Sequence, residues 1–505
     1  MKRKKNRILS LVLCASIVLS GGVPMTFASA ADENVAVAAQ VNENGYASEI
    51  IGNVRVQVLS PTVVRLEERG PEGFEDRETF HIANRDNWEG TGVTREDADG
   101  SVILRTSAFD ITVPADAQDI TGITISDKEG NLLWKYKGMP GSKVYLPDPG
   151  EEVYAWEMSD TPRMTVPEWG FTPQPAENTE NVDTNGFDTN NDAPDMYVFL
   201  PQGDGVQLRK DFNKLTGQTE MLPLSALGAW DSRYYANTQE QALKQIRDYH
   251  ETYQVPLDNL VIDTDWRKSI GTSGTGYEIN TDLFPDMEGF LQDANDMGVN
   301  VMFNDHPEPT RDDGTGEERI AIDSDEVKFR FDNLTHILDL GLEGWWYDRN
   351  WSTTIKAPEG FTHEAIGASI YSYAQKAVYP DERLFMMSNV DGSSNGADIG
   401  APDVAQHRYG ITWTGDIGGH QETLQDELEF TVQYGAIAGL PYISSDIGSH
   451  MTNTDNMTAD EYVKWMQYGT LSPIYRPHCT WVGSADEGRM PWLKGEDALN
   501  IIRDY

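Results

Sequence analysis

The chain has 505 residues, which is too long for one small domain and long enough for a barrel with a companion domain. Its 82 Asp and Glu outnumber its 39 Lys and Arg, and the formal net charge is −43 at pH 7. Such a charge repels the phosphates of nucleic acids and the headgroups of anionic lipids, so neither class of partner is expected.

The first 30 residues have the three parts of a secretory signal peptide. A basic segment at 1–7 precedes an apolar segment at 8–19, and Ala28-Ser29-Ala30 offers a cleavage site. The apolar segment is too short to span a bilayer comfortably. We therefore expect removal of residues 1–30 and a secreted, extracellular protein. Cys479 is then the only cysteine, which excludes an internal disulfide and a cysteine-based zinc site.

Residues 41–137 contain short segments in which apolar and polar residues alternate with a period of two. The segments are NVRVQVLS at 53–60, VVRLEE at 63–68, SVILRTSAFDITVP at 101–114 and GITISD at 122–127, with turns at 98–100 and 128–130. This alternation predicts strands that bury one face. We expect a β-sandwich and assign residues 31–223 to an N-terminal domain of this kind with irregular connecting loops.

The stretch 138–195 is rich in Pro, Gly, Asn and Asp and is expected to be irregular. Within it, residues 181–195 read NVDTNGFDTNNDAPD and offer many oxygen ligands. Their spacing lacks the final Glu of the twelve-residue calcium loop, so a solvated loop is favoured over a calcium site. A loop that reaches over the active site of the next domain is a third possibility.

From residue 224 onward, short apolar segments alternate with amphipathic segments of helical period. Eight strands are expected to end at Trp230, Asp263, Asn304, Asp348, Asn389, Trp413, Ser444 and Arg476. Helices are expected at 238–253, 286–297, 324–340, 362–378, 422–437 and 458–468. This alternation predicts a (β/α)8 TIM barrel over residues 224–505.

Polar residues recur where the predicted strands end. They are Asp263, Asp265, Asp305, His306, Asp348, Asp416, Asp446, Arg476 and His478. A barrel brings all such ends to one mouth, although each acid alone could simply cap a helix or form an ion pair. Carboxylates and Trp, without phosphate-binding glycines or a metal triad, suit sugar chemistry. Two carboxylates can cleave a glycosidic bond, and a separation of about 5 to 5.5 Å would retain the anomeric configuration.

Five ordered motifs carry a resemblance to a known family. WWYDRNW at 345–351 and WTGDIGG at 413–419 resemble the nucleophile and acid/base segments of glycoside hydrolase family 31. VIDTDW, SSDIGSH and YGTLSPIYRPH, at 261–266, 444–450 and 468–478, also match the family in the right order. The resemblance covers roughly residues 224–500, together with the β-sandwich that the family places before its barrel.

The resemblance implies roles for individual residues. Asp348 corresponds to the catalytic nucleophile and Asp416 to the general acid/base. The implied substrate-binding residues are Asp263 and Asp265, which hold sugar hydroxyls, Arg408 and His478 at the ring hydroxyls, Trp413 as a wall of the subsite, and Asp446 in support. This chemistry requires neither a metal nor a cofactor.

Each of these residues also has a purely structural interpretation. Asp263, Arg408 and His478 could be satisfied polar groups near the mouth, and Trp413 could serve packing alone. Other histidines are expected to be hydrogen-bonded structure or to line outer subsites; they are His306, His363, His407, His420 and His450. Cys479 is expected to be a small buried residue rather than a nucleophile.

Two features depart from the usual family pattern. Arg349 follows the nucleophile where many members have Met, and the chain ends at Tyr505 within the expected last barrel helix, which suggests a piece of a longer protein. The combination of WWYDRNW, FNDHPEP at 303–309 and HRYGITWTGD at 407–416 resembles a branch that includes isomaltosyl- and glucosyl-transferring enzymes and enzymes acting on cyclic α-glucans.

We therefore expect a secreted retaining α-glycosidase that acts on an α-glucan or its oligosaccharides. Three alternatives stay open. The first is a transglycosylase that uses the same residues, and the second is an enzyme for another α-sugar such as galactose or N-acetylgalactosamine. The third is a carbohydrate-binding protein without turnover. Linkage preference and oligomeric state do not follow from the sequence.

Overall fold

The structure is a computed structural model. It describes residues 36–141, 152–161, 193–268, 277–306, 324–348, 363–389, 403–418, 421–432, 435, 439–450, 457–480 and 482–504. The signal peptide expected at 1–30 and nearly all of the candidate calcium loop at 181–195 lie outside these ranges. Among the helices that are described, none has the length and hydropathy needed to span a bilayer.

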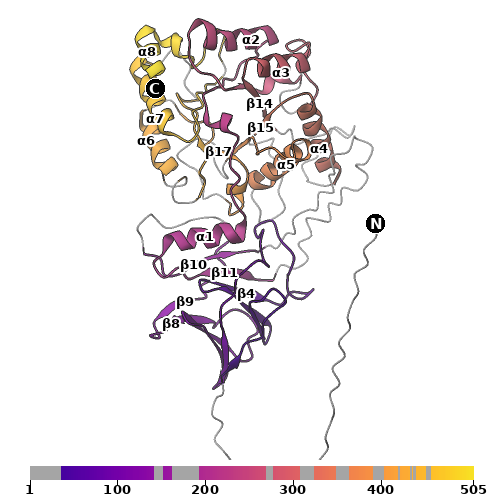
Figure 1. The fold of residues 1–505 in the computed structure, drawn as a ribbon, viewed down its shortest axis with the longest axis vertical. Coiled ribbons are helices and arrows are strands. Elements are labelled where there is room, and N and C mark those ends of the chain that lie inside the picture. The colour runs from indigo at the N-terminus through magenta and orange to yellow at the C-terminus, as the bar shows by residue number, and fades with distance from the viewer. Residues whose placement is uncertain are drawn as a thin grey trace, which may run out of the picture. The chain divides into compact units, whose positions relative to one another are not determined.

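The N-terminal strands form two antiparallel sheets (Figure 1). One sheet has the order β1 (Val37–Ala38), β5 (Thr94–Ala98), β6 (Ser101–Arg105), β7 (Phe109–Pro114), β8 (Thr124–Asp127) and β9 (Leu132–Lys135). The other has the order β10 (Trp156–Ser159), β11 (Asp195–Phe199), β4 (Val63–Glu68), β3 (Val54–Ser60) and β2 (Ala47–Ile51). One cluster of buried apolar side chains takes members from both sheets, as a sandwich requires.

The alternation of apolar and polar residues matches the alternation of buried and less buried side chains in strands such as β7. In β7 every second residue is buried, which places Phe109, Ile111 and Val113 in the shared core. The hairpin between β5 and β6 turns through Asp99 and Gly100, whose φ angles are 41° and 82°. Two successive positive φ angles are the mark of a type I′ turn, which suits the twist of the flanking strands.

Two parts of this domain differ from the prediction. The stretch 138–195, expected to be irregular, contains β10, and its last residue begins β11, which pairs with β4. Helix α1 (Gly205–Thr216) was not predicted; Asp204 caps its first turn by accepting from Val206 and Gln207. The apolar face of α1 packs in a cluster with Val404, which belongs to the C-terminal half of the chain.

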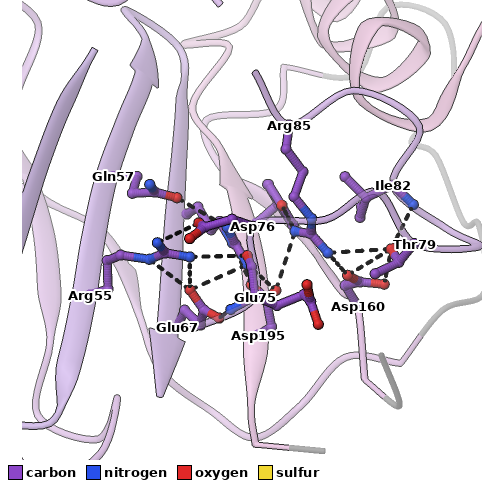
Figure 2. Close-up of polar contacts among 12 residues, drawn as sticks. Arg55, Gln57, Glu67, Glu75, Asp76, Thr79, Ile82, Arg85, Asp160 and Asp195 are labelled. Carbon is purple, nitrogen blue, oxygen red and sulfur yellow. Dashed lines mark hydrogen bonds and ion pairs between the residues drawn. The ribbon is translucent and has the colours of Figure 1, made fainter. Parts of the chain in front are cut away.

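A buried network of charged residues ties the segment after β4 to the five-stranded sheet (Figure 2). Arg85, in this segment, forms ion pairs with Asp160 and Asp195, and Arg55 of β3 donates to the backbone carbonyl of Glu75 in the segment at 3.0 Å. Because buried charges are costly without partners, this network fixes the segment in one position. His81, within the segment, lies 3.2 Å from Asp403 Oδ2.

The C-terminal half is built on a seven-stranded parallel sheet whose strands lie side by side in chain order. They are β12 (Trp230–Asp231), β13 (Asn259–Ile262), β14 (Asn300–Asp305), β15 (Gly344–Tyr347), β16 (Met386–Asn389), β17 (Ile411–Trp413) and β18 (Ile443–Ser444). Helices surround these strands in Figure 1: α2 (Gln239–Arg247), α3 (Met287–Asp296), α4 (Ser324–Asp339), α5 (His363–Val378), α6 (Gln421–Phe430), α7 (Ala459–Leu471) and α8 (Glu496–Asp504).

The curled sheet matches the predicted barrel in part. The eighth strand, expected to end at Arg476, consists of two isolated parallel bridges, Tyr475 with Ala229 and Pro477 with Ile447. These bridges connect residues 475–477 to Ala229, which precedes β12, and to Ile447, which follows β18. The first strand, expected to end at Trp230, lies at Trp230–Asp231, and the 3₁₀ helix Leu224–Leu227 precedes it. After β16 the described residues contain the short 3₁₀ helix Gln406–Arg408 in place of an α-helix.

Alternation along β14 separates the inside of the curled sheet from its outer layer. Val301 and Phe303 pack in the cluster that contains the helices, whereas Met302 packs inside with Trp346 and Trp413. Residues of even number on β14 therefore point inward, and odd-numbered residues point to the helices.

Candidate active site

The acids predicted at the mouth follow the carboxyl ends of neighbouring strands. Asp263 comes directly after β13, and Asp348 directly after β15. The register pairs Ile262 with Phe303 and Tyr347 with Asp305, so these strand ends lie at the same edge of the sheet. Parallel strands thus gather side chains that are far apart in the sequence.

Asp348 is held by two donors from β14 and the residue after it. Asn304 Nδ2 donates to Asp348 Oδ2 at 2.8 Å, and His306 Nε2 lies 2.9 Å from the same oxygen. The backbone N–H of Asp348 donates to the carbonyl of Asp305 at 3.0 Å. The side chain of Asp348 retains only 9% of its accessible surface, so its orientation is fixed by these contacts rather than by water.

His306 supplies the positive charge at this position. Burial opposes its protonation, but the carboxylate of Asp348, followed by that of Asp263, raises the pKa of His306 to about 9. At neutral pH the ring is therefore an imidazolium that donates to Asp348 through Nε2. This ion pair fixes the direction of the Asp348 carboxylate.

Asp263 is a second buried carboxyl at the mouth. Its Oδ1 accepts from the backbone N–H of Thr264 at 2.8 Å, which caps a short 3₁₀ helix. Burial raises the pKa of Asp263 to about 7, opposed by His306 and by the Thr264 hydrogen bond and assisted by Asp348. Asp265, two residues on, is half-buried, and burial raises its pKa as well.

Asp416 follows β17 after a sharp turn at Gly415, whose φ of 87° favours glycine. Its side chain keeps 39% of its accessible surface, so it can meet a ligand that enters the mouth. Loss of hydration raises the pKa of Asp416 to about 8, and the negative charges of Asp348 and Asp446 act in the same direction. These surroundings favour the protonated form of Asp416.

Asp446 organises the inner wall of the site. It is fully buried, its Oδ1 accepts from Trp413 Nε1 at 2.8 Å, and it forms an ion pair with Arg476. The indole of Trp413 meets that of Trp346 edge-on, with ring centroids 4.7 Å apart. Trp413 thus combines core packing with a fixed orientation, and Asp446 acts through the residues it holds.

His478 lies beside this wall. Its ring meets Trp346 edge-on at 5.4 Å, and its Nδ1 lies 2.6 Å from Ser232 Oγ. His478 Nε2 faces His450 Nδ1 at 3.0 Å, and His450 Nδ1 lies 3.6 Å from Asp416 Oδ1. Asp446, His450 and His478 are also the one group among the described residues whose spacing could suit a metal ion.

Arg408 is the one predicted site residue that the structure does not bring into this cluster. Its guanidinium donates to the backbone carbonyl of Phe80 and to Tyr409 Oη, and it lies 5.6 Å from the centre of the Phe80 ring. The 3₁₀ helix that carries Arg408 faces the N-terminal domain there. Its contacts are those of a residue that joins the two halves of the chain.

Other polar residues in the region are structural. Asp305, at an odd position of β14, points to the outer layer and forms a buried ion pair with Arg267 at 2.8 Å. His407 Nε2 contacts the carbonyl of Gly217 at 2.8 Å, as expected of hydrogen-bonded structure. Cys479 is buried, and burial raises the pKa of its thiol to about 11, which confirms the prediction of a small buried residue.

Two histidines at the site were not among the predicted site residues. Both His306 and His450 had been grouped with structural histidines or outer subsites. For His306 a signal was present, because Met302, Asn304 and His306 have the same parity, and the inward direction of Met302 predicts that of the other two. For His450 no strand pattern was available.

The arrangement offers two carboxyl groups with contrasting surroundings at one mouth. Asp348 is paired with His306, and the surroundings of Asp416 raise its pKa. One group can attack an electrophilic carbon while the other protonates a leaving oxygen, which is the chemistry of glycosidic bond cleavage.

Comparisons with known proteins agree with this chemistry. Residues 219–325 and 322–505 match the family described as "Glycosyl hydrolases family 31 TIM-barrel domain", which is more than half of the chain. The chain is 26% identical over 337 residues to an alpha-xylosidase of Saccharolobus solfataricus, a match that covers 61% of this chain and 44% of the relative. It is 24% identical over 380 residues to alpha-glucosidase 2 of Bacillus thermoamyloliquefaciens, with 63% and 44% covered.

Among solved structures, a family 31 dextranase of Flavobacterium johnsoniae in complex with glucose superposes with a TM-score of 0.63. The match covers 91% of this chain and 67% of the dextranase at 16% identity, so it concerns the fold alone. The chain spans less than half the length of the two curated relatives above.

Proposed function

Because the chain belongs to glycosyl hydrolase family 31, we propose that it is a retaining α-glycosidase in which Asp348 is the nucleophile and Asp416 the general acid/base. The observation that carries the proposal is the contrast between these two carboxyls. Asp348 is hydrogen-bonded to Asn304 and to the imidazolium of His306, whereas the environment of Asp416 raises its pKa to about 8.

In the first step an oxygen of Asp348 attacks the anomeric carbon of the bound sugar. The bond between that carbon and the glycosidic oxygen breaks, and its electron pair leaves with the oxygen. Asp416 gives its proton to that oxygen, so the leaving group departs as an alcohol. The products are a glycosyl ester on Asp348 and an ionised Asp416.

In the second step Asp416 removes a proton from water while the water oxygen attacks the anomeric carbon. The ester bond to Asp348 breaks, and its electron pair returns to the carboxylate. The imidazolium of His306 and the amide of Asn304 stabilise that departing carboxylate by the contacts seen in the structure. Both side chains are then in their starting protonation states, and the released sugar has the original α configuration.

For the substrate we propose an α-glucan or its oligosaccharides. The support from the site is that Asp263 is a carboxyl at the mouth and that Trp413 with Trp346 forms an apolar wall beside it. The similarity to an alpha-glucosidase supports a glucoside, and the similarity to an alpha-xylosidase makes an α-xyloside the second sugar to test.

A substrate panel tests this proposal. Purified protein is incubated with isomaltose, nigerose, maltose, panose and an aryl α-xyloside, and products are followed by chromatography and anomeric NMR. We expect free α-glucose as the first product and none with an Asp348→Ala variant. Longer or cyclic products without net release of glucose would show that the activity is transglycosylation and not hydrolysis. If none of these substrates is turned over, a panel of α-galactosides and α-N-acetylgalactosaminides follows. Binding without turnover in both panels would overturn the assignment as an enzyme.

We also propose that the protein is exported. The support is the sequence alone, namely the basic and apolar segments at 1–19 and the small residues at 28–30. N-terminal sequencing of protein expressed in a bacterial host should show a mature start at residue 31 in the culture medium or cell envelope. An unprocessed N-terminus on protein retained inside the cell would contradict this.

A further inference from the structure

His450 lies next to the proposed acid/base, and the mechanism above gives it no role. Its Nδ1 is 3.6 Å from Asp416 Oδ1 and 3.9 Å from Asp446 Oδ2. On its other side it faces His478 Nε2 at 3.0 Å, and His478 Nδ1 lies 2.6 Å from Ser232 Oγ. A chain of hydrogen-bonding groups therefore runs from Ser232 to the carboxyl of Asp416.

The two imidazole rings meet edge to edge. Their planes are 14° from parallel, and their centroids are 5.1 Å apart. This separation is slightly less than the 3.0 Å between the two nitrogens plus the distance from each nitrogen to its own ring centre. The nitrogens thus lie close to the line between the ring centres, and each points at the other. Ligation of one metal ion would require the two lone pairs to converge on a point about 2.1 Å from each nitrogen. The observed geometry suits a proton shared between the rings.

The surroundings of the pair keep both rings neutral. Burial lowers the pKa of His478 well below its ordinary value, assisted by Arg476, His450 and Arg489. Burial also lowers the pKa of His450, with Arg476 and Arg489 acting in the same direction and Asp446 and Asp348 opposing. A neutral imidazole carries one N–H and one lone pair, so the question is which nitrogen of His450 holds the proton.

The neighbouring groups decide the tautomer. His450 Nδ1 faces Asp446, which is ion-paired with Arg476, and also Asp416 and an imidazole nitrogen. A lone pair on His450 Nδ1 would be repelled by the Asp446 carboxylate, whereas an N–H would be attracted to it. The proton therefore belongs on His450 Nδ1, from which it is donated to His478 Nε2. His478 then carries its own proton on Nδ1 and donates it to Ser232 Oγ.

We propose that His450 is a positioning residue for Asp416, whose Nδ1–H turns from His478 to the carboxylate of Asp416 when that group has given up its proton. This inference rests on the proposed function, in which Asp416 is the acid/base. In the resting site Asp416 is protonated, and the N–H stays on His478. As the leaving oxygen takes the proton, the N–H stabilises the developing negative charge and holds the carboxylate in place for the water step. No covalent bond of His450 changes.

The test replaces His450 by Phe, which keeps a flat ring and removes both nitrogens, and by Asn, whose amide N–H can take the place of Nδ1–H. A hydrogen bond to a charged group contributes about 1.5 kcal/mol, equivalent to roughly tenfold in rate. We expect His450→Phe to lower kcat/KM for a disaccharide about tenfold and His450→Asn to restore it to within about threefold. The same variants should change kcat/KM for the corresponding α-glycosyl fluoride less than about threefold, because fluoride leaves with little help from an acid.

A second readout is the pH dependence. Without the donor, the ionised form of Asp416 is less stable, so the alkaline limb of kcat/KM should move upward by about 0.5 to 1 pH unit in His450→Phe. Ser232→Ala should move it in the same direction by less. A matched control is His407→Asn, since His407 is buried and hydrogen-bonded away from the mouth.

Each outcome is decisive. Equal losses on both substrates, an unmoved alkaline limb, or an Asn variant no better than Phe would assign His450 to packing alone and overturn the inference. Those results leave the proposed function intact, because wild-type turnover and its loss in Asp348→Ala are measured in the same series. Absence of wild-type turnover on both substrates would instead overturn the proposed function and the inference together.

Discussion

Replacing His306 by Gln tests whether a cation beside Asp348 is needed for activity. The pKa of His306 rises from 6.5 to about 9, which corresponds to roughly 3 kcal/mol of interaction with its carboxylate neighbours after burial has been overcome. Because coupling between sites is reciprocal, the carboxylates lose a similar amount of stabilising free energy when the charge of His306 is removed. Asp348 receives most of this change, since it makes the 2.9 Å contact.

We therefore expect the acidic limb of the pH–kcat/KM profile to move upward by about 1 to 2 pH units in His306→Gln. Asn304→Ala is the matched control, because it removes a neutral donor to the same oxygen at 2.8 Å and should move the limb by less than about 1 unit. The assay is initial rate with an aryl α-glycoside between about pH 4 and 9, a range that includes the ordinary and the raised pKa of His306. Equal displacements in the two variants, or none in His306→Gln, would refute the reasoning that charge rather than hydrogen bonding is decisive.

Three further predictions concern other parts of the molecule. Since the pKa of Asp263 is raised from 3.8 to about 7, the stability that this group contributes falls as pH rises through that range. Asp263→Asn should therefore raise the free energy of unfolding in urea by up to about 4 kcal/mol more at pH 8 than at pH 4, while activity is lost. An equal effect at both pH values would contradict this. Arg85→Ala should lower the free energy of unfolding by about 3 to 5 kcal/mol, because the buried carboxylate of Asp160 loses its arginine partner, although Asp195 keeps Arg65. Lys464→Ala, at an exposed ion pair with Asp460, should have little effect on the free energy of unfolding, and similar costs for the two variants would refute the role given to burial. Asp416→Ala should lower kcat/KM about 10²- to 10⁴-fold for a disaccharide and far less for an α-glycosyl fluoride, and a uniform loss would remove Asp416 from the acid/base role.

Much of the barrel could be predicted because its signals are local. The helix expected at 238–253 begins as predicted, with Thr238 and Gln241 forming a capping box. Gly298 and Gly341 follow α3 and α4 with φ angles of 80° and 106°, which places the ends of these helices where the glycines are. Once strand ends are located, the parallel arrangement brings Asp263, Asp348 and Asp416 to one mouth without further information.

The features that were missed depend on contacts between distant segments. β10 pairs with β11 and β11 pairs with β4, although 35 residues separate the end of β10 from the start of β11 in a stretch of turn-forming composition. The segment 475–477 makes bridges to both neighbours without forming a regular strand. Arg408 lies in a motif that resembles the family, yet its side chain is directed by Phe80 of the other domain, which no local pattern reports.

The central claim is a covalent glycosyl intermediate on Asp348, and trapping that intermediate tests it most directly. The protein would be incubated with a 5-fluoro-α-glucosyl fluoride, which forms the ester readily and hydrolyses it slowly, and then digested for peptide mass spectrometry. We expect one glycosyl group on the peptide that contains Asp348 and none in an Asp348→Ala variant. A glycosyl group on another residue, or sustained turnover of a natural substrate without any adduct, would contradict the mechanism.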